Sequence, residues 1–311
     1  MSSEIVGLIP AAGEGKRMRP LSLYRPKFLL PIMDRPLVSF SINDMLKGGV
    51  NQQMICVKDD WALFWTRKLI CAENEWLEIN KNATLSIDSL IYSIQLHINA
   101  DFLAVYLPDI YLHKKGENTL HGMVETMANS DADMVVGVTR APPSTFKEHL
   151  RVNVEADGRI TDIGMVWHDE PNFQRTGRFL IKVRSAKKLL TGLGGLNGGE
   201  RVLLKLTSLM IKKGFRVQAY LMESITNINT PLDLLKVNLQ ELRNRKLKFY
   251  IGSANIVNST IINSVVCSGA KIESSLLESS LVLSDSTLTG RKVSQAIIFG
   301  DNMHFDCSKL T

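Results

Sequence analysis

The sequence predicts an α/β domain with a mixed, mostly parallel sheet, followed by a short β-solenoid. Two observations lead to this prediction. Over most of the chain, apolar runs with strand character alternate with segments whose apolar residues fall at helical spacing. Such alternation is typical of a parallel sheet covered by helices. After residue 255 the pattern changes to single aliphatic residues separated by small and polar ones. We therefore expect two domains, residues 1–247 and 248–311.

The elements of the first domain follow from local pattern. Strands are expected at 4–9, 51–58, 101–110, 133–140, 177–183 and 215–222. A hairpin is expected at 150–166, around the Asp157-Gly158 turn signal. Helices are expected at 36–49, 86–98, 118–130, 199–214 and 230–246. Ligands of such sheets bind outside the carboxyl ends of the strands, which is where Asp109 falls.

The second domain is predicted from spacing alone. Aliphatic residues recur in steps of 5, 5, 6, 5, 5, 6, 5 and 5 at Ile256, Ile261, Val266, Ile272, Leu277, Val282, Leu288, Val293 and Ile298. A repeat of sixteen residues in three steps suits a three-sided coil whose aliphatics stack into a core. The alternative is a serine-rich disordered tail, which would not keep nine aliphatics in phase.

Composition excludes some classes of protein. The formal net charge is +6 and the pI is about 9.1, but the basic residues do not form a tract with interleaved aromatics. We therefore do not expect nucleic-acid binding. The four cysteines show no metal-ligand spacing, and no segment resembles a signal peptide or a membrane span. The expected setting is a reducing cytoplasm.

A cationic, glycine-bearing loop follows the first predicted strand, in the stretch "PAAGEGKRMRPLSLYRPKFLLPI". Such loops bind anions when backbone N–H groups and cations converge. The dinucleotide fingerprint needs a third glycine, where this chain has Met18. The spacing of a Walker-type phosphate loop is absent. A charged surface turn is the simpler alternative.

The whole stretch "AAGEGKRMRPLSLYRPKFLLPIMDRPLV" resembles the signature of sugar-1-phosphate nucleotidylyltransferases. The positions that match are Gly13, Gly15, Arg17, Pro20, Leu21, Pro26, Lys27, Leu29, Leu30, Pro31 and Pro36. The resemblance extends to "FLAVYLPDI" and "ITNINTPLDLLKVN", and it implies a Rossmann-like nucleotidyltransferase domain with a left-handed β-helix. It also implies transfer of a nucleoside monophosphate from a nucleoside triphosphate to a sugar 1-phosphate, with Mg²⁺ as cofactor and pyrophosphate as product.

The resemblance also implies roles for particular residues. Arg17 and Lys27 would be catalytic, holding charge on the leaving pyrophosphate and on the α-phosphate. The metal would be bound by Asp109 and Asn227. The nucleotide would be bound by Ala12, Gly13, Gly15, Lys16 and Ser86. The acceptor would contact Arg151, Gly177 and Arg178.

The sequence departs from the family pattern on the acceptor side. Asn227 stands where the family has a second metal-binding aspartate, and Asn229 where it has a glycine. Met165 and Val166 stand where a glutamate and a lysine are expected. Two interpretations stay open: an active enzyme, or a catalytically weakened homologue that acts as a nucleotide-binding regulatory or assembly subunit. The open end of the solenoid predicts a homo- or hetero-oligomer.

Overall fold

The computed structural model describes residues 4–70, 77–81, 99–113, 118–140, 151–164, 173–189, 200–223 and 225–310. The chain divides into two compact units. The first contains Met1–Gly13 and Phe40–Ile225, and the second contains Glu14–Ser39 and Thr226–Thr311. The second unit therefore combines the signature loop (residues 14–36) with the C-terminal part of the chain. This division differs from the expected boundary after residue 247, which stays a prediction.

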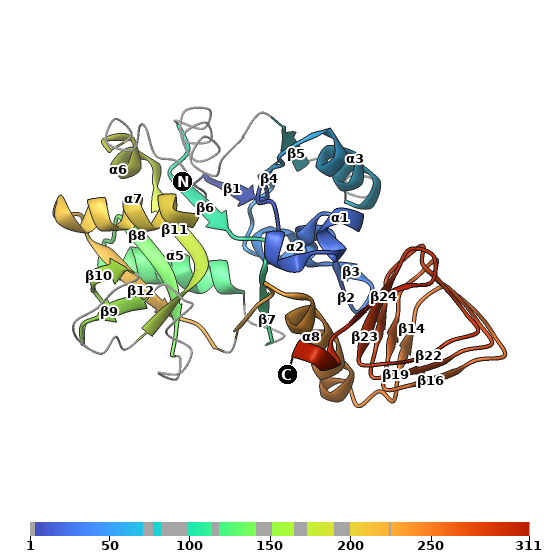
Figure 1. Cartoon of the computed structure of the whole chain (residues 1–311). Helices are drawn as coiled ribbons and strands as arrows, with labels where there is room; N and C mark the ends of the chain where they lie inside the picture. Colours follow the sequence, from blue (N-terminus) through green and yellow to red (C-terminus); the bar gives the residue numbers. More distant parts are fainter. Residues whose placement is uncertain are drawn as a thin grey trace. The chain divides into compact units, whose positions relative to one another are not determined.

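The first unit is built on one nine-stranded sheet, the mixed and mostly parallel sheet that the sequence predicts (Figure 1). Its strands are β1 (Ile5–Pro10), β4 (Gln52–Cys56), β5 (Leu77–Asn80), β6 (Phe102–Tyr106), β8 (Met134–Thr139), β9 (Arg151–Val154), β10 (Ile160–Gly164), β11 (Phe173–Lys182) and β12 (Val217–Leu221). The order is β10-β9-β11-β6-β1-β4-β5, and β8 pairs with both β11 and β12.

The centre of this sheet is parallel. Strand β1 pairs in parallel with β4 and with β6. Strand β11 runs antiparallel to β6 and β8, which makes the sheet mixed. The central strands read as continuous apolar runs because both of their faces are buried; Leu8, Leu103 and Val135 all have 0% exposure.

Helices connect and cover these strands. They are α2 (Leu37–Lys47), α3 (Asp60–Leu69), α5 (Thr119–Ser130), α6 (Val183–Lys187) and α7 (Glu200–Lys212). Helix α2 begins in the second unit and continues into the first. Helices α5 and α7 both contact β12, and α7 also contacts β10. No helix in the described ranges is both long and apolar enough to cross a membrane.

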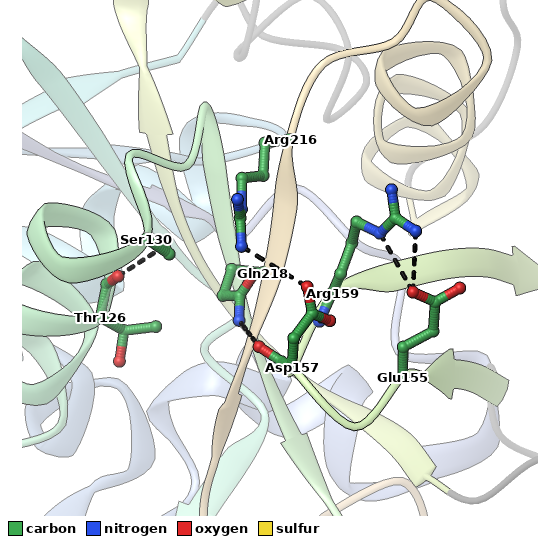
Figure 2. A network of polar contacts seen from close by, with 7 residues as sticks. All are labelled: Thr126, Ser130, Glu155, Asp157, Arg159, Arg216 and Gln218. Atoms are coloured by element: carbon green, nitrogen blue, oxygen red, sulfur yellow. Dashed lines mark hydrogen bonds and ion pairs between the residues drawn. The ribbon is translucent and has the colours of Figure 1, made fainter.

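The predicted hairpin around Asp157-Gly158 is confirmed as β9 and β10 (Figure 2). Gly158 takes the left-handed conformation with φ of 82°, which the turn requires. Gln218 of β12 donates from Nε2 to the Asp157 carbonyl at 2.6 Å. At the hairpin, the Arg159 guanidinium binds the Glu155 carboxylate, with Nη2 to Oε2 at 2.8 Å. Local turn chemistry therefore determines this element.

The second unit begins with the signature loop and ends with a parallel β-helix. The loop holds η1 (Lys16–Met18), α1 (Leu21–Tyr24), η2 (Lys27–Leu29), β2 (Pro31–Ile32) and β3 (Arg35–Pro36). Helix α8 (Pro231–Asn244) precedes the β-helix, whose strands run from β14 (Tyr250–Ile251) to β24 (Met303–Asp306). Figure 1 draws these strands as a three-sided stack in orange to red.

The three faces of the β-helix confirm the predicted repeat. The sheets are β14-β17-β20-β23-β24, β15-β18-β21 and β16-β19-β22. Their strands are β15 (Asn255–Val257), β16 (Thr260–Ile262), β17 (Val265–Val266), β18 (Lys271–Glu273), β19 (Leu276–Glu278), β20 (Leu281–Val282), β21 (Thr287–Thr289), β22 (Lys292–Ser294) and β23 (Ala296–Phe299). Ile256 pairs with Ile272, which pairs with Leu288, so the predicted aliphatics stack. The left-handed sense of the coil stays a prediction.

The serines of this region bind one coil to the next. The Oγ atom of Ser264 accepts from the Ser280 N–H at 3.0 Å, and the Oγ atom of Ser280 accepts from the Ala296 N–H at 3.1 Å. Both serines have 0% exposure. Each serine also donates back to a carbonyl two residues earlier, at Ile262 and Glu278. A serine-rich composition here therefore reflects hydrogen bonds between coils, and the disordered-tail alternative is wrong.

Some elements were not foreseen. Helix α3 and strand β5 follow β4, where the sequence analysis expected no element. Strand β11 begins at Phe173, four residues before the expected start at Gly177. The extension is interrupted by a shift in register between Arg175 and Phe179, with Gly177 at φ of 71°. The helix expected at 86–98 lies outside the described residues.

Candidate active site

The signature loop of the second unit is a packed structure. Met18, Leu21 and Leu30 have 0% exposure, and Phe28 and Leu29 are buried with them. Arg17 remains exposed and Lys27 is half-buried. The apolar residues thus fix the backbone from which the two cations project.

Gly15 makes the tight start of this loop possible. Its φ is 61°, in the left-handed region that favours glycine. The hydroxyl of Ser22 donates to the Gly15 carbonyl at 2.9 Å. A Cβ atom at Gly15 would lie 3.2 Å from the Ser22 Cβ and 3.3 Å from the Lys27 Cβ. The glycine therefore brings the start of the loop close to the segment that carries Lys27.

A second part of the site is the N-terminus of α8. The Thr230 hydroxyl accepts from the Asp233 N–H, and the Asp233 carboxylate accepts from the Thr230 N–H, which together form a capping box. The same carboxylate accepts from the Asn229 N–H at 3.0 Å. Pro231 at the first turn suits a helix start. This cap explains the Thr-Pro-x-Asp pattern and fixes the backbone of Asn229.

The two predicted catalytic cations meet at Asn229. The Arg17 Nη2 and the Lys27 Nζ each donate to the Asn229 Oδ1 at 3.1 Å. One neutral amide oxygen thus accepts from two positive groups that come from different turns of the loop. Cationic donors bind an anionic oxygen more strongly than a neutral one. The position taken by the amide oxygen is therefore suited to a phosphate oxygen.

Asp109, the predicted metal ligand, lies in the first unit on the turn between β6 and β7 (Ile110–Leu112). Arg178 of β11 holds this turn. Its Nη1 donates to the Leu107 carbonyl at 2.8 Å and its Nη2 to the Ile110 carbonyl at 3.2 Å. The Leu107 N–H in turn donates to the Gly177 carbonyl at 2.9 Å. Gly177 and Arg178 therefore support the turn that presents Asp109.

Arg178 is deeply buried, with 1% exposure. Its guanidinium lies 4.3 Å from the centroid of the Tyr106 ring. Burial lowers the pKa of Arg178, and nearby groups, Tyr106 first and then the Asp44 and Asp109 carboxylates, oppose this effect. A guanidinium enclosed by carbonyls and a ring has no exposed surface for a phosphate. The predicted contact between Arg178 and the acceptor stays a prediction, and it would require the guanidinium to leave these partners.

Asp44 of α2 completes this charged cluster, and sequence reasoning did not select it. One of its carboxylate oxygens accepts from the Thr119 N–H at 3.2 Å, at the start of α5. Burial raises the pKa of Asp44, while the Arg178 charge lowers it in part. An acidic residue inside a predicted amphipathic helix was a signal that could have indicated a buried charge partner. For Asn229, the sequence signal was only its departure from the family pattern, which has a glycine there.

The other predicted site residues differ in how far the structure describes them. Gly13 has no described atom within 4 Å of an added Cβ, so space is open there. Lys16 is exposed and forms an ion pair with Glu14 at 3.0 Å. Ala12 follows β1, and Arg151 begins β9. Ser86, Met165 and Val166 lie outside the described residues.

The described part of the chain holds no group of three or more His, Cys, Asp or Glu side chains that could bind an ion. The predicted ligands Asp109 and Asn227 belong to different compact units. Both carry oxygen donors, which is the ligand type that Mg²⁺ prefers.

Comparison with known proteins relates the chain to one family. A family model described as nucleotidyl transferase matches residues 6–163. A UTP–glucose-1-phosphate uridylyltransferase of Mycoplasma genitalium is 22% identical over 272 residues, which cover 77% of this chain and 92% of the relative.

Solved structures share the fold. A UTP-bound UGPase from Acinetobacter baumannii superposes with a TM-score of 0.63 at 18% identity, covering 79% of this chain and 96% of that one. The inositol-1-phosphate CTP transferase of T. maritima superposes with a TM-score of 0.61 at 17% identity, covering 75% of this chain and 92% of that one. At these identities the likeness concerns the fold alone.

Proposed function

Because the chain belongs to the nucleotidyl transferase family, we propose that it transfers a nucleoside monophosphate from a nucleoside triphosphate to a sugar 1-phosphate. The observation that carries the proposal is the convergence of Arg17 and Lys27 on the Asn229 Oδ1, each at 3.1 Å. The relative from Mycoplasma genitalium, which is named for glucose 1-phosphate, supports the class of acceptor.

The proposed reaction brings two anions together. A phosphate oxygen of the sugar 1-phosphate attacks the α-phosphorus, and the bond from that phosphorus to the bridging oxygen of the β-phosphate breaks. Pyrophosphate leaves with the electron pair of that bond. The protein contributes position and charge stabilisation, since no covalent step on a side chain is required. Arg17 and Lys27 would bind the phosphate oxygens on which negative charge gathers.

We propose Mg²⁺ as the cofactor, and Asp109 and Asn227 stay its predicted ligands, since each offers a side-chain oxygen of the type that Mg²⁺ prefers. When bound, it would neutralise phosphate charge. With few protein ligands, phosphate oxygens and water would supply the rest of its coordination, which is common for Mg²⁺. An amide brings no charge, so Asn227→Asp should tighten Mg²⁺ binding in the presence of nucleotide.

The setting and the remaining site residues are also proposals. Gly13, Gly15 and Lys16 would contact the triphosphate through backbone N–H groups and charge. Arg151 and Arg178 stay the predicted cations on the acceptor side. The described thiols of Cys267 and Cys307 are buried and form no disulfide, which suits the proposed reducing cytoplasm. The open end of the β-helix would support an oligomer.

The test is pyrophosphate release from a matrix of nucleoside triphosphates and sugar 1-phosphates with Mg²⁺, with the Lys27→Ala protein as background. We expect release from at least one pair, at a rate well above that background. If no pair released pyrophosphate while nucleotide still raised the melting temperature, the result would contradict catalysis and favour a nucleotide-binding regulatory protein. If no nucleotide shifted the melting temperature, the result would contradict nucleotide binding by the loop.

A further inference from the structure

The β-helix touches the signature loop at one corner of its coils. Ser268, Ser284 and Gly300 each follow by two positions a residue of the register Val266–Val282–Ile298, so they lie at the same corner of three successive coils. We call this the loop-facing corner. It contacts the segment 24–34, which contains Lys27. All of these residues belong to the second unit.

Asp34 forms the first contact with this corner. It lies between β2 and β3, and its φ of 71° shows that the chain reverses there. One carboxylate oxygen accepts from the Ser268 N–H at 2.9 Å, and the other accepts from the Ser268 hydroxyl at 2.5 Å. Aspartate is one of the residues that adopt the left-handed region more readily than others. The carboxylate binds the tip of the loop to the coil.

The approach at this point is close enough to restrict the β-helix as well. A Cβ atom at Gly252 would lie 2.6 Å from the Asp34 Oδ2 and 2.6 Å from the Ser268 Oγ. Only glycine therefore fits beside this carboxylate. The hydroxyl of Ser268 also accepts from the Ser253 N–H at 3.0 Å, which connects the contact to the first coil.

Arg25 and Tyr24 form the second contact, on the next two coils. Arg25 has 2% exposure, and its Nη2 lies 3.7 Å from the Asp285 Oδ2. The Tyr24 hydroxyl donates to the Ser284 carbonyl at 3.3 Å. The Tyr24 ring lies 6.0 Å from the Phe299 ring, between centroids. A buried guanidinium two residues before Lys27 is thus held by the β-helix.

Helix α8 holds the same segment from another side. The Asn238 Oδ1 accepts from the Met33 N–H at 2.8 Å, and its Nδ2 donates to the Pro31 carbonyl at 3.1 Å. Asn238 has 0% exposure. Helix α8 also contacts β17 and β23 of the β-helix. Asn229 lies at the N-terminus of α8. The loop that carries the two cations and the helix that positions their acceptor therefore both contact the β-helix.

We propose that the β-helix is a positioning element for the phosphate-binding cations, with Ser268 and Asp285 as its positioning residues. The proposal rests on the proposed function for its catalytic meaning. Lys27 lies between two anchors, Arg25 and Asp34, that both end on the loop-facing corner. Fixing both ends removes freedom from the segment that carries Lys27, so less entropy is lost when a phosphate binds.

The test compares two serines of the same β-helix in the full chain. Ser268→Ala removes the hydroxyl that binds Asp34. Ser280→Ala is the matched control, since Ser280 is buried and its hydrogen bonds to Ser264, Glu278 and Ala296 lie within the β-helix. Hydrogen exchange of peptides spanning 20–36 reports the loop, and the melting temperature reports the β-helix. Neither readout requires turnover.

We expect Ser268→Ala to speed exchange in residues 24–34 by about tenfold, the effect of losing one hydrogen bond to a charged group. The same variant should lower kcat for pyrophosphate release by about tenfold or more, because small displacements of positioned groups are costly. Ser280→Ala should lower the melting temperature without changing loop exchange. Asp34→Ala combined with Ser268→Ala should cost less than the sum of the two single changes.

Two outcomes would overturn the proposal. In the first, Ser280→Ala speeds loop exchange as much as Ser268→Ala does, so that the loop responds only to overall stability. In the second, Ser268→Ala, Asp34→Ala and Asp285→Asn all leave loop exchange unchanged. If the wild-type protein released no pyrophosphate, the exchange results would still decide the proposal, while the proposed function would fail separately.

Discussion

The loop of the second unit and strand β11 of the first unit each carry cations for which a phosphate contact was predicted. These cations differ in their exposure and in their hydrogen-bond acceptors. Arg17 is exposed and Lys27 is half-buried, and both donate to one side-chain amide oxygen. Arg178 has 1% exposure and donates to two backbone carbonyls. The first pair can exchange its partner for a ligand, whereas Arg178 cannot do so without opening the core.

An arginine close to a site can therefore support that site in two ways. A cation whose acceptor is a side-chain amide at the surface keeps its charge available. A buried cation stabilises the backbone that its carbonyl partners belong to, here the turn with Asp109. Substitutions should therefore separate the two regions: loss of activity in the loop, and loss of stability at Arg178.

The largest effect is expected for Lys27→Ala. Removing one of two charges that stabilise the transferring phosphate should lower the rate of pyrophosphate release by about 100- to 1,000-fold. The melting temperature should change little, since a half-buried lysine that binds an amide adds little to folding. Stopped assays would measure the rate of pyrophosphate release, and circular dichroism would measure the melting temperature. Arg19→Ala, which removes an exposed cation of the same loop, is the control. A similar fall in rate for both variants would mean that only overall charge matters.

The next effect is expected for Arg178→Met. It leaves two carbonyls without their donor and the buried Asp44 without a nearby positive charge, and such losses cost about 3 kcal/mol of unfolding free energy. Urea unfolding would measure this, with Arg17→Ala as the comparison, for which we expect less than about 0.5 kcal/mol. Equal losses for Arg17→Ala and Arg178→Met would contradict the distinction between the two regions.

A smaller effect concerns pH and the acid beside Arg178. Because burial raises the pKa of Asp44 in the folded protein, the folded state binds more protons than the unfolded state above the ordinary aspartate pKa. Stability should therefore fall as pH rises from that value through the raised pKa. Asp44→Asn should remove this fall. Urea unfolding of both proteins across pH would measure it, and parallel curves would show that Asp44 does not titrate in this window.

The smallest effect is expected for Arg159→Ala at the β9–β10 hairpin. Arg159 and Glu155 form an ion pair at 2.8 Å, but their side chains are 52% and 47% exposed (Figure 2). Exposed ion pairs contribute little because water screens both charges. The unfolding free energy should therefore change little, and the rate should not change. A loss as large as that of Arg178→Met would mean that burial does not rank these arginines.

Two parts of the structure could be predicted because their signals are local or repeated. The β-helix follows from aliphatics in steps of five and six, and the stacking of Ile256, Ile272 and Leu288 confirms it. The family resemblance follows from a continuous segment, and the match of the family model confirms it. The hairpin at Asp157-Gly158 follows from its turn residues. Strand β11 was predicted too short because the irregularity at Gly177 interrupts its pattern.

Short-range spacing in the sequence was enough to predict the class of fold, the family and the identity of the loop cations. What each cation touches depends on tertiary packing. Arg17 and Lys27 reach Asn229 across 212 and 202 residues of chain. Arg178 reaches the Asp109 turn across about seventy residues, with 71 to Leu107. Burial and charge at such contacts depend on how distant segments pack, and no local pattern encodes that packing.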